Sequence, residues 1–182
     1  MVLRIAVLLS ILSMAFVTSA QDTIAPGDVI EGEAADAVVP FTFDAVAGDS
    51  FTFSIEADFT PVLTVQDAAG EVFASSEDLR FTDLPMLFVA PADGTYTLVV
   101  GTSFGEPEGA YTLGMNTVDV EPIAYGDSVS LAPEEVVAYY FSFEGAEGDV
   151  INVYATSEDD DVQLRVMSTA GVELEEDDDD GD

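Results

Sequence analysis

The feature that most constrains this chain is an alternation of apolar and polar residues that occurs twice. Residues 41–55 read FTFDAVAGDSFTFSI, and residues 141–155 read FSFEGAEGDVINVYA. In each segment a Gly-Asp pair, typical of a tight turn, interrupts the alternation. Because successive side chains on a strand point to opposite faces, each segment predicts a β-hairpin with one apolar face. Such a hairpin builds a core rather than a catalytic centre.

Other short segments predict further strands. Residues 62–67 alternate with Leu63 and Val65 on one face, and residues 67–70 predict a turn. Residues 86–90 form a short apolar run between two prolines, which is typical of a buried strand. No stretch of the mature chain has a helical period.

The pattern Gly-x-Tyr-Thr-Leu is a second internal echo. It occurs at residues 94–98 and again at residues 109–113, each time after a turn-rich segment. We expect these two segments to be adjacent strands that close one sheet.

The chain repeats itself with a period of about one hundred residues. The offset between the copies grows from 99 at Gly27 and Gly126 to 101 at Gly70 and Gly171. Slips of one residue are tolerated in loops, whereas a slip inside a strand would turn its core face to solvent. The period is too long for a solenoid repeat, so the pattern predicts an all-β fold of tandem antiparallel β-sandwich domains, jelly-roll-like in form.

The second copy is expected to be incomplete. It ends before any counterpart of the apolar run at residues 86–90 or of the Gly-x-Tyr-Thr-Leu strands. A sandwich without its closing strands leaves unpaired edges, so this part either belongs to a longer product or borrows strands from a partner. We favour the longer product. The predicted organisation is a signal peptide at residues 1–20, a sandwich domain at 21–118, a linker at 119–125 and a partial sandwich domain at 126–182.

The first twenty residues predict secretion. A single basic residue, Arg4, precedes an apolar run that ends in small residues, as in a secretory signal peptide. No later apolar run is long enough for a transmembrane segment. The chain has no cysteine, which excludes disulfides and thiolate metal sites. We expect a protein that is secreted or held at the cell surface.

The charge balance excludes some classes of partner. Without Arg4, the two remaining basic residues, Arg80 and Arg165, face 37 acidic ones. Nucleic acid and anionic membranes bind through Lys and Arg, so neither is an expected partner. The acidic surface has two interpretations. One is solubility or adaptation to a salty or acidic medium, and the other is cation binding.

The chain has few of the residue types that catalytic sites use. The chain has no histidine and no cysteine, so it cannot assemble a Ser-His-Asp triad, a Cys-His pair or a histidine-based zinc site. Chance pairs of carboxylates are expected among 37 acids, and no Asp or Glu stands out from the rest. We therefore expect no enzyme.

Two acidic segments are candidate calcium sites. Residues 175–182 read EEDDDDGD, where alternating carboxylates precede a glycine as at the start of an oxygen-ligand calcium loop, although the closing bidentate Glu is missing. A second cluster precedes the strand expected at Val162. A solvated acidic turn is the alternative interpretation of both. The candidate ligands are Glu158, Asp159, Asp160, Asp161, Glu176, Asp178, Asp180 and Asp182.

Exposed aromatic residues offer a third kind of site. Tyr139 and Tyr140 are adjacent, so one of them points away from the core of a regular strand, and Phe104 lies in a glycine-rich loop. Such rings can stack on sugars, but scattered exposed apolar residues are also normal on a protein surface.

The layout resembles the bacterial pre-peptidase C-terminal domain, a β-sandwich module attached to many secreted enzymes and surface proteins. The resemblance covers most of the mature chain. It implies a non-catalytic module, and some members of that family bind calcium or extracellular polymers. It rests on residues 41–43, 47–49, 67–70 and 92–98 in the first copy and on residues 141–143, 148–149, 164–166 and 171 in the second.

These observations favour a secreted, non-catalytic accessory or binding module for an extracellular polysaccharide or protein. Two alternatives stay open. One is a calcium-stiffened structural or adhesive spacer of a cell-surface protein, which needs folded domains and cations but no shaped loop surface. The other is the non-catalytic part of a secreted peptidase.

Overall fold

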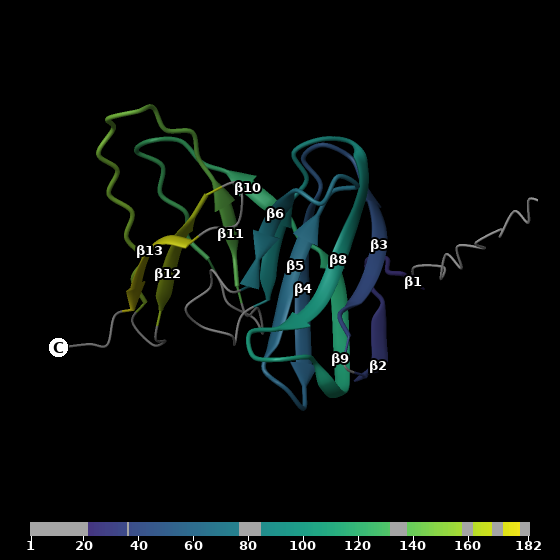
Figure 1. Ribbon diagram of the computed structural model, residues 1–182. Helices are drawn as coiled ribbons and strands as arrows, with labels where there is room; N and C mark the ends of the chain where they lie inside the picture. Colours follow the sequence, from purple (N-terminus) through teal and green to yellow (C-terminus); the bar gives the residue numbers. More distant parts are fainter. Residues whose placement is uncertain are drawn as a thin grey trace, which may run out of the picture.

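The computed structural model describes residues 22–35, 37–76, 85–131, 138–157, 162–168 and 173–178. This part of the chain is built from strands, which confirms the all-β prediction (Figure 1). None of it is a helix long and apolar enough to cross a membrane. The predicted signal peptide lies outside the described residues.

The strands follow one another closely along the chain. Their bounds are β1 Asp22–Thr23, β2 Val29–Ala35, β3 Val39–Ala45, β4 Ser50–Ala57, β5 Pro61–Gln66, β6 Val72–Ser75, β7 Met86–Val89, β8 Gly94–Thr102, β9 Glu108–Thr117, β10 Val120–Pro122, β11 Tyr140–Ser142, β12 Gln163–Met167 and β13 Glu173–Asp178.

The first nine strands form a sandwich of two sheets. One sheet has the order β1-β3-β8-β5-β6 and the other the order β2-β9-β4-β7. From β2 to β9 the chain changes sheet at every connection except the β5–β6 hairpin. Apart from the short parallel pair β1–β3, neighbouring strands in both sheets are antiparallel. This arrangement is a jelly roll, as the sequence predicts.

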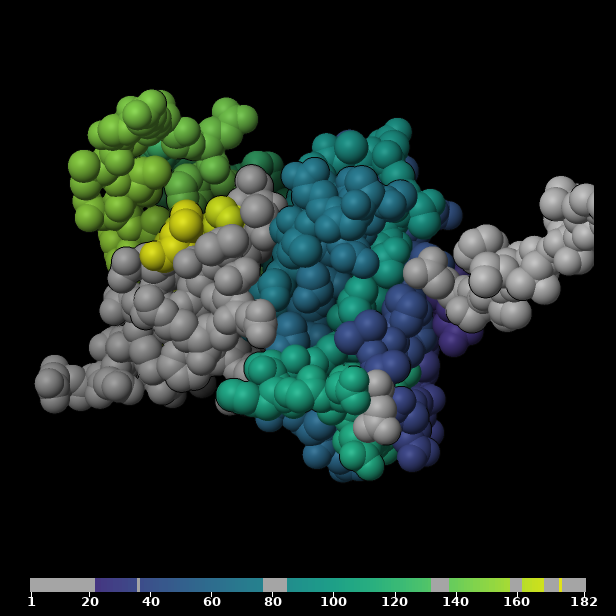
Figure 2. All heavy atoms as spheres, in the orientation of Figure 1, coloured from purple at the N-terminus to yellow at the C-terminus, as the bar shows by residue number. Residues whose placement is uncertain are grey.

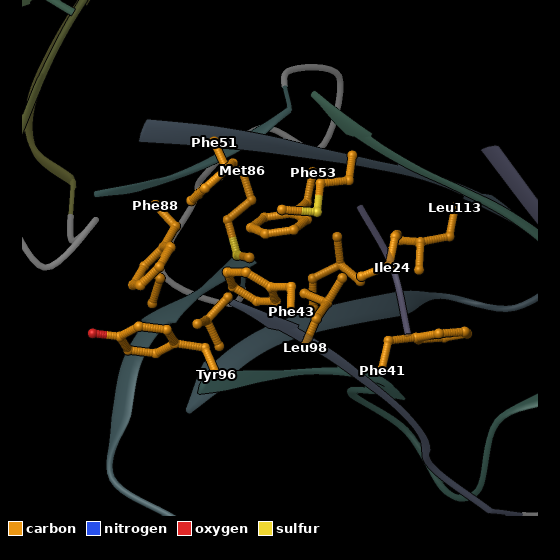
Figure 3. Close-up of a cluster of buried hydrophobic side chains, with 14 of the residues drawn as sticks. Ile24, Phe41, Phe43, Phe51, Phe53, Met86, Phe88, Tyr96, Leu98 and Leu113 are labelled. Carbon is orange, nitrogen blue, oxygen red and sulfur yellow. The ribbon is translucent and has the colours of Figure 1, made fainter. Parts of the chain in front are cut away.

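The core lies between the two sheets and takes alternate residues from the longer strands, such as β3, β4 and β8 (Figure 3). In β3, Phe41 and Phe43 are buried, and in β4, Phe51 and Phe53 are buried, whereas the residues between them are more exposed. The core contains no buried polar or charged residue among those that the structure describes. Hydrophobic burial of this kind is the main stabilising term in the fold.

Phe43 is at the centre of an aromatic cluster. Its ring centroid lies 5.5–5.9 Å from those of four other rings, of which three cross it at steep angles and one is stacked. Edge-to-face and offset arrangements at these distances are favourable beyond the burial of area. The four rings come from both sheets, and they belong to Phe51, Phe53, Phe88 and Tyr96.

The predicted hairpin at residues 41–55 is wrong in its pairing, although its apolar face is right. β3 pairs with β8, and β4 pairs with β7 and β9, so the two strands face each other across the core. The turn between them is held by the loop after β7, because Gly48 N donates to Ala90 O at 2.8 Å and Ala47 N donates to Asp93 Oδ1 at 2.9 Å. The connection is therefore an arch from one sheet to the other.

The two Gly-x-Tyr-Thr-Leu segments are also not neighbours. They begin β8 and β9, and these strands are inner members of different sheets. Each places its Tyr and Leu in the core, so the shared pattern reflects a shared inward face. The expectation that they pair within one sheet is wrong, because each is bonded to strands from other parts of the chain.

Other local predictions are confirmed. Leu63 and Val65 of β5 are buried on one face. The turn after β5 closes with a hydrogen bond of 3.0 Å from Gly70 N to Asp67 O, and Gly70 has a positive φ of 84° that favours glycine. In the apolar run at residues 86–90, alternate residues are buried against the core.

The described C-terminal residues form two small sheets (Figure 1), and these residues lie to one side of the sandwich in the space-filling view (Figure 2). β10 pairs in parallel with β11, and β12 pairs with β13 in an antiparallel hairpin. Strand β10 lies within the segment expected to be a linker. The predicted hairpin at residues 141–155 does not form, because residues 150–157 are not in a strand. In the part of the chain that the structure describes, no strand pairs with them.

Candidate binding surfaces

Four Gly-Asp turns use their carboxylates to hold the backbone. In each turn the Asp side chain accepts a hydrogen bond of 2.8–2.9 Å from the amide three residues earlier, and the glycine has a φ of 91–94°. Asp and Gly suit these positions because the carboxylate satisfies a free amide and glycine tolerates the positive φ. The four carboxylates belong to Asp28, Asp49, Asp127 and Asp149.

Other acidic side chains in the sandwich also serve the fold. Asp67 Oδ1 accepts from the amides of Ala69 and Glu71 at 2.8 and 2.9 Å. Asp44 accepts from Thr95 Oγ1 at 2.6 Å, and Asp58 accepts from Ala110 N at 3.3 Å. Many carboxylates of this acidic chain are therefore engaged in turns and strand ends.

The predicted calcium ligands divide into two sets. Six of them lie outside the described residues: Glu158, Asp159, Asp160, Asp161, Asp180 and Asp182. The other two, Glu176 and Asp178, lie in β13, where Glu176 is opposite Arg165 and Asp178 is opposite Gln163. Residues 175–178 lie in an extended strand, which places Glu176 and Asp178 two positions apart along its length, and the assignment of calcium to this segment stays a prediction.

No group of three or more acidic side chains is arranged to hold a metal ion in the described part of the chain.

The structure does contain a shallow, open depression of about 470 Å³ on the outer face of the five-stranded sheet. Three strands supply it: Thr42 from β3, Thr95 and Thr97 from β8, and Gln66 from β5. Thr97 lies directly opposite both Thr42 and Gln66 in the sheet, which sets their side chains in a row. The turn at residues 67–70 forms the rim, with the carboxylate of Asp67 and three small residues.

The side chains that the strands supply to this polar depression are neutral, and the rim adds the carboxylate of Asp67. Threonine hydroxyls and a glutamine amide can both donate and accept hydrogen bonds. Thr42 and Thr97 are each flanked in sequence by buried core residues, so the sandwich core holds their strands in place. Sequence reasoning missed these residues. The signal was present in the threonines between core positions, but grouping them required the strand order.

The aromatic candidates are separated. Phe104, in the loop after β8, is 81% exposed. It follows Thr102, which pairs with Pro61, whereas the polar depression lies near the other end of β8. Tyr139 is exposed, and Tyr140 on β11 is half-buried. These residues do not form one platform with the depression.

Three tyrosines have pKa values above the ordinary value. Burial raises the pKa of Tyr140, and the charge of Arg165 offsets part of that increase. Burial, and then the charge of Asp22, raise the pKa of Tyr111 above its ordinary value of 10.0. The pKa of Tyr125 is raised by desolvation and by Asp149, whose carboxylate accepts a hydrogen bond of 3.2 Å from the Tyr125 hydroxyl.

Comparison with known proteins finds partial structural similarity. No family model matches the chain, and no curated protein matches it. The pre-peptidase C-terminal domain of a collagenase from Bacillus anthracis is 17% identical, with a TM-score of 0.44 over 52% of this chain and 93% of that one. The chain is also similar to PliG of Aeromonas hydrophila, a periplasmic inhibitor of g-type lysozyme, at 15% identity and a TM-score of 0.43, over 53% of this chain and 95% of that one.

Proposed function

We propose that this protein is a secreted, non-catalytic β-sandwich module that binds an extracellular polysaccharide or protein. The polar depression on the outer face of the five-stranded sheet carries the proposal. It presents neutral hydrogen-bonding side chains on regular strands, with one carboxylate at its rim, and the aromatic core packs behind those strands. A site built on strands is held more precisely than a site on loops.

The chemistry of the depression favours a neutral partner with many hydroxyl or carbonyl groups. Sugar hydroxyls and peptide groups pair well with threonine and glutamine side chains. An acidic polymer would meet the excess of carboxylates on this chain and be repelled. The signal-peptide pattern and the resemblance of the sequence to the pre-peptidase C-terminal domain support a secreted accessory role.

Binding to insoluble polymers tests this function. We expect the chain to be retained on at least one of cellulose, chitin or collagen, and we expect Thr97→Arg to weaken retention by roughly tenfold, which corresponds to about 1.4 kcal/mol. The long arginine side chain would fill the depression and remove a hydroxyl. Retention is measured by pulldown over a range of polymer concentrations, with and without a chelator.

Thr112→Arg is the matched control for this experiment. Thr112 lies on β9, an inner strand of the other sheet, opposite Glu31 and Glu56. The same change there leaves the depression intact and should alter retention less than about twofold, as for a surface substitution away from the site. Equal losses in both variants would contradict the assignment of binding to the depression.

A calcium-stiffened spacer is a second candidate, favoured by the charge balance of 37 acidic residues. Calcium would reduce repulsion between carboxylates and bind through the acidic segments near the C-terminus, with the millimolar affinity typical of extracellular modules. In this case calcium raises the melting temperature, and no polymer is retained. The alternative role as the non-catalytic part of a secreted peptidase is compatible with either candidate.

The double substitution Asp178→Asn and Asp180→Asn tests the calcium site. If calcium binds there, the rise in melting temperature with millimolar calcium should disappear in this variant, while the fold is kept. Sodium chloride at equal ionic strength measures general screening, which also stabilises a highly charged chain. The control is Glu31→Gln with Glu33→Gln, two exposed residues of β2 with the same spacing and charge change. If the melting temperature of the Asp178 and Asp180 variant still rises with calcium, that segment is not the calcium site.

A further inference from the structure

The hydrogen bonds around the polar depression determine which of its groups can still donate to a ligand. Thr95 Oγ1 donates to Asp44 Oδ1 at 2.6 Å. A threonine hydroxyl has one hydrogen, and an ionised carboxylate can only accept, so this bond uses the single donor of the Thr95 side chain. Towards the depression, Thr95 is therefore left as an acceptor.

Asp67 is a second fixed acceptor in the depression. Its Oδ1 atom accepts from the amides of Ala69 and Glu71 at 2.8 and 2.9 Å, and these bonds hold the turn. Its Oδ2 atom has no hydrogen bond to any residue that the structure describes. Because Asp67 lines the depression, this second oxygen and its negative charge are available to a ligand.

Thr97 and Gln66 add groups that can both donate and accept. They lie opposite each other on β8 and β5, and both line the depression. Within the described part of the chain, neither side chain is engaged in a hydrogen bond. A hydroxyl and a primary amide each have donors and acceptors to offer. The depression thus combines two fixed acceptors with two groups that also donate.

The polar groups cover a small area. Thr42, Thr97 and Gln66 form a row across three strands, and neighbouring strands are about 4.8 Å apart, so the row is about 10 Å long. Thr95 lies about 7 Å from Thr97 along β8. An area of this size suits a short stretch of a sugar polymer, whereas a stable protein interface buries about 800 Å² on each partner.

A ligand with closely spaced hydroxyl groups matches this set of donors and acceptors. Each sugar hydroxyl can donate to Asp67 or Thr95, and it can also accept from Thr97 or Gln66. Carbonyl, carboxylate and sulfate oxygens only accept, so they would face the Asp67 carboxylate without a hydrogen bond. An ammonium group only donates, so it would leave the free donors of the site unpaired.

We propose that the polar depression binds a neutral polysaccharide through the free hydroxyl groups of its sugars, and that the Asp67 carboxylate gives the site its preference for those hydroxyls. This inference rests on the proposed function and narrows the partner from polysaccharide or protein to polysaccharide. Hydrogen bonds from a hydroxyl to a carboxylate are shorter and stronger than those between neutral groups. Asp67 is therefore expected to contribute more to binding than any threonine of the row.

Asp67→Asn is the direct test, because it changes one acceptor into a donor and keeps the turn. The amide oxygen can still accept from Ala69 N and Glu71 N, and the amino group takes the place of Oδ2. Asparagine is also common in turns of this kind. We expect retention on insoluble cellulose or chitin to weaken by at least about tenfold, the scale for losing a hydrogen bond to a charged group.

Asp28→Asn is the matched control for charge and for the turn. Asp28 Oδ2 accepts from Ala25 N at 2.8 Å in the turn before β2, and Asp28 does not line the depression. The substitution removes the same negative charge, and retention should change by less than about twofold, as for a surface position away from the site. Urea denaturation of both variants shows whether the fold is kept.

Competition with soluble oligosaccharides tests the hydroxyl groups without altering the protein. Cellohexaose, for a chain retained on cellulose, or chitohexaose, for one retained on chitin, should release the chain. Their permethylated forms keep the oxygens as acceptors but have no hydroxyl donors, so release should need at least about a tenfold higher concentration. Asp67→Asn should reduce this preference, since its amino group can donate to the methylated oxygens. The added bulk of the methyl groups affects both proteins and cancels in the comparison.

The outcomes separate this inference from the proposed function. Retention on collagen alone would overturn the inference, while the binding function would stand. Retention on cellulose or chitin that is equal in the Asp67 and Asp28 variants would also overturn it, as would equal release by the free and the permethylated oligosaccharides. A chain that is retained on none of the three polymers would contradict the proposed function and this inference together.

Discussion

Replacing Phe43 by alanine should lower the free energy of unfolding of the sandwich by about 3–5 kcal/mol. The side chain is buried and contacts rings from both sheets, at 5.5–5.9 Å between centroids. Its removal loses transfer free energy and leaves a cavity that the surrounding rings can fill only in part. Since small domains have total stabilities of about 5–15 kcal/mol, this loss is a large fraction of the free energy of unfolding of the domain. Urea denaturation followed by tyrosine fluorescence measures the change.

Phe104→Ala is the matched control, because it makes the same chemical change at a side chain that is 81% exposed. Its effect should stay within about 0.5 kcal/mol, as is usual for surface substitutions. A loss below about 1 kcal/mol for Phe43→Ala, or similar losses for both variants, would contradict the position of Phe43 at the centre of the core.

Separating the chain after residue 118 should yield one piece that folds and one that does not. Residues 21–118 contain all nine strands of the sandwich and its complete buried core, and the amide of Val118 still donates to Ser50 O at 3.0 Å. We expect this piece to unfold cooperatively as a monomer. Residues 119–182 contain two small two-stranded sheets, and isolated two-stranded units are marginally stable in water. This piece should show weak amide protection and bind a hydrophobic dye.

Hydrogen exchange, dye fluorescence and urea denaturation of the two pieces check this prediction. The intact chain is the reference, since it shows whether the C-terminal strands gain protection from the sandwich. A C-terminal piece that folds cooperatively into a protected monomer would contradict the repeat alignment, and residues 126–182 would then be a smaller domain of another kind.

The sequence alone was sufficient to predict the inward faces of β3, β4 and β5. The alternation in residues 41–55 placed Phe41, Phe43, Phe51 and Phe53 inside, because side-chain direction along a strand has a period of two whatever the strand pairs with. The Gly-Asp turns were also predictable from local chemistry, since glycine supplies the positive φ and aspartate accepts a neighbouring amide.

Strand partners were decided only in the tertiary structure. A hairpin and an arch between two sheets have the same alternation around a turn, and the amides of Ala47 and Gly48 are satisfied by the loop after β7. The two Gly-x-Tyr-Thr-Leu segments show the same ambiguity, because a shared inward face does not say which sheet a strand joins. In the C-terminal copy, residues 151–155 alternate like a strand but are not in one. A strand needs a partner as well as a pattern.

The candidate sites show the same division between local and non-local information. Composition determined that the chain is acidic and has no histidine or cysteine, and this limits its chemistry whatever the fold. Only the fold showed which carboxylates hold turns, and only the register of β3, β8 and β5 brought Thr42, Thr97 and Gln66 side by side. Residues far apart in the sequence meet through the pairing of strands, and that pairing depends on the energy of the whole sandwich rather than on any single segment.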